Sequence, residues 1–182
     1  NKKGDLTYNI REILRIIDNA GNDELKPDFL CFTETAYDRG VGLSFDEMAV
    51  CENSGVMELM KKKALHYKMN IIFSIHEKSS EGIYNTAYLI SDEGQIIGKH
   101  RKTQITYSET VTGLIPGDKL EVFETKFGKV GIMICWEQWY PEVARKLCKK
   151  GAEIIFCPTA GDPEDIQRAR ARENGVYLVI SG

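Results

Sequence analysis

Cys135 is the residue around which a catalytic site can be built. It follows residues 130–134, an apolar run with β-branched side chains that predicts a buried strand. Pro141 and Glu142 then indicate the start of a helix. We therefore expect Cys135 at the carboxyl end of a strand, where open α/β sheets bind ligands. A thiol in that position is a candidate nucleophile, and its alternative role is that of a buried structural cysteine.

Two charged residues follow other predicted strands in the same way. Glu34 comes just after residues 29–32, and Lys102 comes just after residues 95–99. If these strands share a parallel sheet with the strand before Cys135, all three side chains meet at one edge. Taken singly, Glu34 and Lys102 are more simply exposed loop charges, and Cys135 is more simply part of the core.

Together the three side chains support acyl transfer from nitrogen. A cysteine thiolate attacks a carbonyl or nitrile carbon, and a carboxylate takes the thiol proton and later activates water. A lysine ammonium stabilises the developing oxyanion, aided by a backbone N–H beside the nucleophile. A rival hypothesis is a Cys–His hydrolase or transferase, in which His76 or His100 activates Cys135.

The elements that must position these residues alternate between helices and strands. Helices are predicted over residues 6–20, 53–68, 141–150 and 162–175. Strands are predicted over residues 29–32, 71–75, 86–90, 95–99, 130–134, 153–157 and 176–180. Residues 91–94 form the turn of a hairpin, and residues 103–117 form a long connection typical of a lid or binding loop. This order predicts an α/β layered fold with a mixed sheet.

Composition narrows the function classes. The chain has 182 residues, of which 42% are hydrophobic, so one domain with a sizeable core is expected. A net charge of -3 disfavours nucleic acid as a partner. Five cysteines without a Cys-x-x-Cys pair argue against a disulfide framework and a zinc site, and fit reduced thiols in the cytoplasm. No apolar run approaches membrane-spanning length, so no membrane partner is expected.

Four segments resemble the carbon-nitrogen hydrolases of the nitrilase superfamily. They are residues 28–35, 98–103, 131–137 and 169–177, which occur in the family's order and span nearly the whole chain. The resemblance implies Glu34 as general base and acid, Lys102 as oxyanion stabiliser and Cys135 as nucleophile. It also implies Glu109 as a second, supporting glutamate. The backbone N–H of Trp136 would complete the oxyanion hole.

The same resemblance implies a nitrilase-like α-β-β-α sandwich with mixed sheets, subunits that associate into a homo-oligomer, and no cofactor or metal. Residues 135–142 look most like the N-carbamoyl amidases, so an amide or N-carbamoyl amine is the expected small-molecule substrate. A nitrile is the alternative substrate, and a catalytically silent binding or assembly domain is the alternative class. Trp139 and Tyr140 are candidates for a pocket wall or for the core. We expect residues 1–182 to be a single domain truncated at both ends, with the sandwich incomplete.

Overall fold

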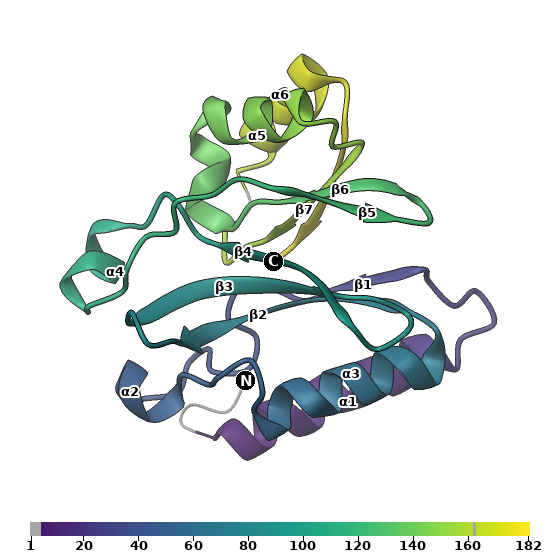
Figure 1. Cartoon of the computed structure of the whole chain (residues 1–182), viewed down its shortest axis with the longest axis vertical. Helices are drawn as coiled ribbons and strands as arrows, with labels where there is room; N and C mark the ends of the chain where they lie inside the picture. Colours follow the sequence, from purple (N-terminus) through teal and green to yellow (C-terminus); the bar gives the residue numbers. More distant parts are fainter. Residues whose placement is uncertain (1–4, 162) are drawn as a thin grey trace.

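A computed structural model describes residues 5–161 and 163–182, and it contains two sheets stacked between two layers of helices (Figure 1). The first sheet has the order β1-β2-β3-β4, with strands β1 (Phe29–Cys31), β2 (Asn70–Lys78), β3 (Ile83–Ile90) and β4 (Ile96–Arg101). The second has the order β5-β6-β7-β8, with strands β5 (Val122–Thr125), β6 (Gly128–Ile132), β7 (Ile154–Pro158) and β8 (Tyr177–Ser181). Each sheet mixes parallel and antiparallel pairs, so the predicted α-β-β-α sandwich is confirmed.

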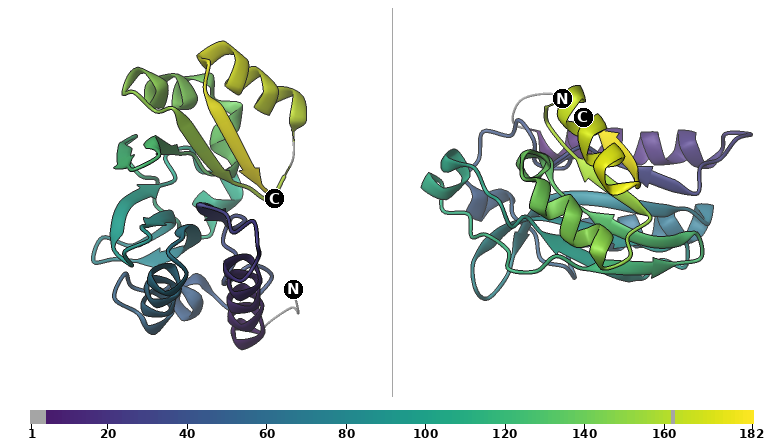
Figure 2. Two further views of the ribbon diagram at one scale, coloured as in Figure 1. Left: turned by 90° about the vertical axis from the view of Figure 1, so that its right-hand side faces the viewer. Right: turned by 90° about the horizontal axis from the view of Figure 1, so that it is seen from above.

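The outer layers consist of two helix pairs. They are α1 (Leu6–Gly21) with α3 (Gly55–Tyr67), and α5 (Pro141–Lys149) with α6 (Glu164–Asn174). Figure 2 shows the first pair side by side at one end of the molecule and the second pair at the other. Three short helices complete the description: α2 (Phe45–Met48), α4 (Tyr107–Val111) and the 3₁₀ helix η1 (Cys135–Trp139). None of the described helices is both long and apolar enough to cross a membrane.

The packing of the core explains why the sequences of the buried strands are continuous apolar runs. Along β2, Phe73 packs with α1 and α3, whereas the neighbouring Ile72 packs between the two sheets. On the facing sheet, Ile132 belongs to the same inner cluster as Ile72. Because both faces of β2 are covered, it needs apolar side chains in both directions. The stacking also places the ends of strands from different sheets close together.

Strand direction decides how the candidate residues meet. β1 pairs parallel with β2, and two antiparallel steps lead to β4, so β1 and β4 run the same way. Their carboxyl ends therefore bring Glu34 and Lys102 to one edge of the first sheet. Cys135 follows β6 in the second sheet. The idea of one shared sheet thus holds for Glu34 and Lys102 but is wrong for Cys135, which reaches them through sheet stacking.

Several elements differ from the sequence prediction. β5 was not predicted, and the long connection after Lys102 contains α4. β6 ends at Ile132, and Cys135 begins η1, which precedes α5. These elements are only a few residues long, which is too short for hydrophobic periodicity to reveal them. The predicted helix start at Asp162 lies outside the described residues, and α6 is described from Glu164.

Candidate active site

Loops from the ends of four strands converge on the site. Glu34 follows β1, Lys102 follows β4, Cys135 follows β6, and Thr159 follows β7. The Thr159 carbonyl accepts hydrogen bonds from the Thr33 hydroxyl and, at 3.4 Å, from the Glu34 N–H. Hydrogen bonds across the sandwich therefore tie the loop that carries Glu34 to the second sheet.

Lys102 lies between two carboxylates. Its Nζ is 2.8 Å from Glu34 Oε1 and 2.8 Å from Glu109 Oε1. The Lys102 backbone N–H donates to the Asn85 carbonyl at 2.8 Å, which extends the pairing beyond the end of β4. Lys102 is only 2% exposed, so its interpretation as a solvated loop cation is wrong. A buried ammonium requires such partners, because an unpaired charge is costly away from water.

Asn85 is a site residue that no sequence motif indicated. Its Nδ2 donates to Glu34 Oε1 at 2.9 Å and to Glu109 Oε1 at 3.0 Å, so one amide group holds both carboxylates around Lys102. A single asparagine inside a predicted strand carries no spacing signal. Only the paired register of β2 and β3, which sets Asn85 opposite His76, could have shown that it faces the site.

Glu109 is brought to Lys102 by the first turn of α4. The Thr106 hydroxyl accepts the Glu109 N–H at 3.2 Å, and Glu109 Oε2 accepts the Thr106 N–H at 2.7 Å. This reciprocal capping box fixes the start of the helix. The structure therefore places Glu109 in direct contact with Lys102, and its supporting role stays a prediction.

Cys135 occupies a sharp turn between strand and 3₁₀ helix. Its φ angle is +43°, in the left-handed region that non-glycine residues rarely adopt. Such strained backbone often occurs at functional positions. Trp136 follows in the first helical turn, whose N–H groups lack partners within the helix. Trp136 as a whole is 38% exposed.

The surroundings of Cys135 favour the neutral thiol. Burial raises the pKa of the Cys135 thiol, and the Glu34 carboxylate nearby raises it further. A hydrogen bond from Thr159 and the charge of Lys102 lower this pKa, but they do not outweigh burial. The sequence could not decide between these opposing effects. Because the resting group is a thiol, attack on a substrate requires a base to remove its proton.

The buried side chains of Lys102 and Glu109 both stay charged. Burial alone would lower the pKa of Lys102, but Glu34 and Glu109 together raise it above its ordinary value. Burial alone would raise the pKa of Glu109, but Lys102 lowers it overall. The cavity therefore holds a fixed ammonium beside Cys135, as oxyanion stabilisation requires.

A buried carboxylate supports the turn that contains Cys135. Glu137 Oε2 accepts the Ile134 N–H at 2.6 Å, and Glu137 Oε1 accepts the Thr103 N–H at 2.8 Å. His100 Nε2 lies 2.7 Å from Glu137 Oε2. Glu137 therefore connects the cysteine turn with the residue after Lys102.

His100 belongs to this support and does not line the cavity. It therefore does not have the position that the Cys–His hypothesis requires. Burial alone would raise the pKa of Glu137, but His100, Thr103 and the Ile134 N–H lower it overall. The carboxylate consequently remains charged inside the sandwich.

The fourth matching segment supports the same turn from α6. Arg170 of this segment donates from Nε to the Gln138 carbonyl at 3.0 Å. Gln167, which precedes the segment on the same helix, donates from Nε2 to Gln138 Oε1 at 2.9 Å. All three residues are buried or nearly so. The segment thus acts by holding η1 against α6, at a distance from the cavity itself.

A small polar cavity of about 240 Å³ connects the candidate residues. Its lining consists of Glu34, Thr35, His76, Asn85, Lys102, Thr106, Ser108, Glu109 and Cys135. Trp139 and Tyr140 do not line this cavity, so they do not form its wall. They are 45% and 38% exposed, so they do not belong to the core either. The cavity brings the three predicted catalytic residues together and adds hydroxyl, amide and imidazole groups around them.

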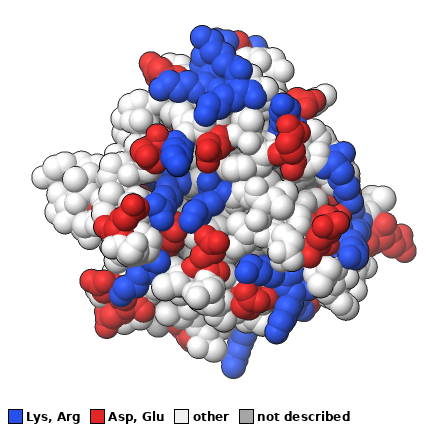
Figure 3. All heavy atoms as spheres, in the orientation of Figure 1, with Lys and Arg blue, Asp and Glu red and all other residues white. Residues whose placement is uncertain are grey.

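A larger cavity of about 500 Å³ lies beside α5 and is lined partly by Lys146, Lys149 and Lys150. Figure 3 shows Lys and Arg side chains gathered at the end of the molecule that carries the second helix pair, while charges of both signs are mixed over the rest of this face. Neither Glu34 nor Cys135 lines that cavity. Size alone therefore does not mark the site of chemistry.

Fold and site together define an α-β-β-α protein with a cysteine, a lysine and two glutamates around one polar cavity. The family model described as carbon-nitrogen hydrolase matches residues 1–182. The chain therefore belongs to the carbon-nitrogen hydrolase family, within the nitrilase superfamily that the sequence motifs indicated.

Individual relatives agree with this assignment. The N-carbamoylputrescine amidase of Arabidopsis thaliana is 38% identical over 148 residues, which cover 71% of this chain and 49% of the relative. The probable hydrolase YhcX of Bacillus subtilis (strain 168) is 40% identical over 135 residues, which cover 69% of this chain and 26% of the relative. The chain thus spans about a quarter to a half of the length of these relatives.

A solved structure gives the same result. The crystal structure of Saccharomyces cerevisiae Nit3, a member of branch 10 of the nitrilase superfamily, matches with a TM-score of 0.86 and 26% identity. The match covers 98% of this chain and 70% of that chain. The two proteins therefore share the layered architecture over nearly the whole length of this chain.

Proposed function

We propose that the protein hydrolyses a non-peptide carbon-nitrogen bond, in an amide or an N-carbamoyl amine, through an acyl-enzyme intermediate on Cys135. The observation that carries the proposal is the buried Lys102, held between Glu34 and Glu109 in the cavity that Cys135 also lines. Family membership and a relative named N-carbamoylputrescine amidase support this substrate class.

The first half of the proposed reaction forms the acyl-enzyme. Glu34 accepts the proton of the Cys135 thiol while the sulfur attacks the substrate carbonyl carbon. The Lys102 ammonium and the Trp136 N–H stabilise the negative oxygen of the tetrahedral intermediate. The carbon-nitrogen bond then breaks, and the leaving nitrogen takes the proton from Glu34. The products of this half are an amine, or ammonia, and a thioester.

The second half returns the enzyme to its resting state. Glu34 removes a proton from water, and the resulting hydroxide attacks the thioester carbon. Lys102 again stabilises the oxyanion, and the departing sulfur regains a proton from Glu34. Water is consumed, and an acid, or carbamic acid for a carbamoyl substrate, is released. The resting thiol of Cys135 gives Glu34 a defined task in both halves.

We also propose that the protein acts in the cytoplasm as a homo-oligomer. All five cysteines are free in the described structure, which supports a reducing compartment. Trp136, Trp139 and Tyr140 are partly exposed on one segment, and such clustered aromatic side chains are typical of contact surfaces. Size-exclusion chromatography with light scattering tests the assembly, and a monomer at all concentrations would contradict it.

The deciding experiment is mass spectrometry of the full-length protein incubated with amides, N-carbamoyl amines and nitriles. An acyl or carbamoyl adduct on Cys135, together with product release, supports the proposal. The Cys135→Ala variant is the matched control and should form neither adduct nor product. Turnover of nitriles alone would replace the substrate class, and turnover that persists in Cys135→Ala would exclude the mechanism. A folded protein without any turnover would favour the silent binding domain.

A further inference from the structure

His76 is a cavity residue to which the proposed reaction gives no task. It lies on β2 directly opposite Asn85 of β3, so both side chains project from the same face of the sheet. Asn85 holds Glu34 and Glu109, which places His76 one residue away from the charged group around Lys102. The His76 side chain is 10% exposed and lines the same cavity as Cys135.

A buried aspartate fixes the orientation of His76. Asp38 Oδ2 accepts the His76 backbone N–H at 3.1 Å and lies 2.9 Å from His76 Nδ1. Because this oxygen acts as an acceptor, Nδ1 carries a hydrogen. The Asp38 side chain is fully buried, and its position is therefore set by packing rather than by solvent.

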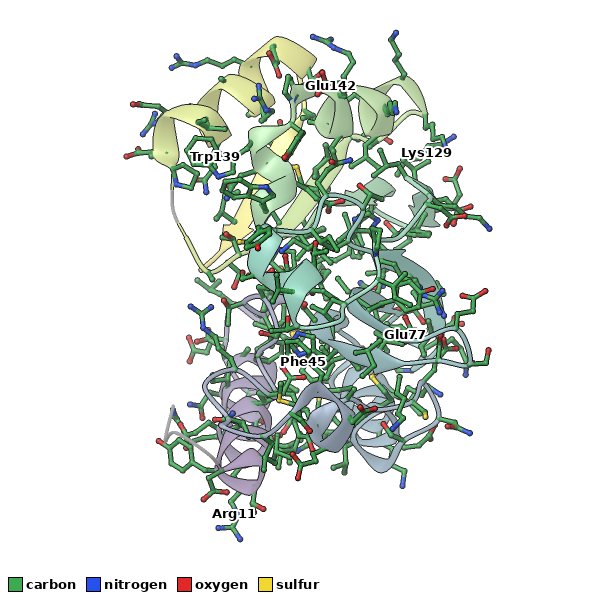
Figure 4. All side chains as sticks on the ribbon, turned by 90° about the vertical axis from the view of Figure 1, so that its left-hand side faces the viewer. Arg11, Phe45, Glu77, Lys129, Trp139 and Glu142 are labelled. Atoms are coloured by element: carbon green, nitrogen blue, oxygen red, sulfur yellow. The ribbon has the colours of Figure 1, made fainter. Side chains whose placement is uncertain are left out.

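An aromatic contact also packs against the imidazole ring of His76. The Phe45 ring lies 4.4 Å from the His76 ring, centroid to centroid, at an interplanar angle of 38°. Phe45 is the first residue of α2 and is labelled in Figure 4, which looks from the side on which α4 lies. Asp38 and Phe45 together leave the ring little freedom to rotate.

His76 Nε2 is the remaining polar atom of this ring. Among the residues that the structure describes, it makes no hydrogen bond. With the hydrogen on Nδ1, Nε2 of the neutral ring carries a lone pair and accepts an N–H. In the proposed reaction Glu34 moves protons and Glu109 holds Lys102, so His76 supplies an acceptor that is available to the substrate.

We propose that His76 is a specificity-determining residue that accepts a hydrogen bond from the terminal NH₂ of a carbamoyl group. This inference rests on the proposed function and narrows its substrate class to N-carbamoyl amines. An acetyl group has nearly the same size and shape but presents a methyl group in place of the NH₂. A site built to pair with an N–H discriminates strongly against an analogue that lacks it, because the acceptor is left unpaired.

The test compares N-carbamoyl and N-acetyl derivatives of the same primary amines, in the full-length protein and two variants. His76→Phe keeps a ring beside Phe45 but removes the acceptor, whereas His76→Gln retains an acceptor oxygen. We expect His76→Phe to lower kcat/KM for the carbamoyl compounds about ten- to hundredfold, with less than about a threefold change for the acetyl compounds. His76→Gln should recover part of the loss. Circular dichroism confirms that the variants fold.

Two results would overturn the assignment. Equal losses of kcat/KM on both substrate series would show that His76 has a structural role or activates Cys135, and not that it selects the substrate. Unaltered kcat/KM for the carbamoyl compounds in His76→Phe would show that His76 does not contact the NH₂. Neither result excludes hydrolysis of a carbon-nitrogen bond through Cys135. Absence of both turnover and a Cys135 adduct in the unaltered protein refutes the proposed function, and the assignment of His76 with it.

Discussion

The residues that the two sheets contribute to the site are held in position in different ways. The first sheet provides Glu34, Lys102 and Asn85, which are joined by ion pairs and hydrogen bonds from side chain to side chain. The second provides Cys135, which lies at a strained backbone turn with a φ angle of +43°. The difference shows that Lys102 is oriented by the charges around it, whereas Cys135 is oriented by its backbone turn.

Glu137 connects the part of the site on the first sheet with the part on the second sheet. It accepts the Ile134 N–H beside the cysteine turn and the Thr103 N–H after Lys102. This buried carboxylate therefore couples the position of the nucleophile to the position of the ammonium. Substitutions in the first sheet, in the second sheet and at Glu137 can test this difference between the two sheets.

The largest loss of activity should come from a substitution in the second sheet. Replacing Cys135 with alanine removes the nucleophile, and we expect kcat to fall on the order of ten-thousandfold or more. The fold should persist, because the side chain is only half-buried and the alanine fits the same turn. Steady-state kinetics with a thermal melt measures both. A melting temperature that falls along with activity would instead assign Cys135 a role in the core.

The next effect comes from the first sheet. Lys102→Met keeps an unbranched side chain one atom shorter but removes the ammonium, so the oxyanion loses its charged partner. We expect turnover to fall about a hundredfold or more. Stability should also fall by roughly 3–5 kcal/mol, because Glu34 and Glu109 become an unpaired acidic pair. Denaturant unfolding checks this second part, and a variant with full activity would exclude the oxyanion role.

Substitutions at Glu137, which connects the two sheets, should mainly affect stability. Glu137→Ala leaves His100 and two backbone N–H groups without their acceptor, and we expect a loss of roughly 3–5 kcal/mol. Glu137→Gln keeps the shape and should lose less. Denaturant unfolding at neutral pH compares the variants. Equal stability of Glu137→Ala and the unaltered protein would contradict the coupling role.

The same carboxylate predicts a pH dependence. Its pKa is lowered in the folded protein, so its contribution is present above the unfolded-state pKa of about 4.3 and is lost as pH falls through the folded-state value. As pH falls below about 4.3, Glu137→Gln should therefore lose less stability than the unaltered protein. Parallel unfolding curves over this range would contradict the prediction.

The smallest effect concerns the resting thiol. Because burial raises the pKa of Cys135, a neutral alkylating reagent should modify it several-fold more slowly at pH 7 than it modifies free cysteine. The rate should rise with pH to a midpoint above that of free cysteine. Mass spectrometry of the labelled peptides measures this, with the exposed Cys51 as internal comparison. Faster labelling at neutral pH would mean that Lys102 outweighs burial.

Much of the site could be read from the sequence, because residue type and strand-end position are local properties. Glu34, Lys102 and Cys135 each follow a strand that apolar runs predicted. Asn85 was missed because an asparagine inside a strand gives no pattern, and its role depends on which strand lies opposite. The catalytic roles of the three strand-end residues remain predictions, which kinetics of the Cys135 and Lys102 variants can test.

The sequence by itself determined the layered α/β class, the family and the three strand-end residues, since these depend on hydrophobic periodicity and short motifs. Only the tertiary structure decided that Cys135 comes from a different sheet, that Lys102 is buried between two carboxylates, and that His76 faces the same cavity. The physical reason is that burial and charge pairing arise between segments distant along the chain. Local pattern carries no information about which of these segments stack.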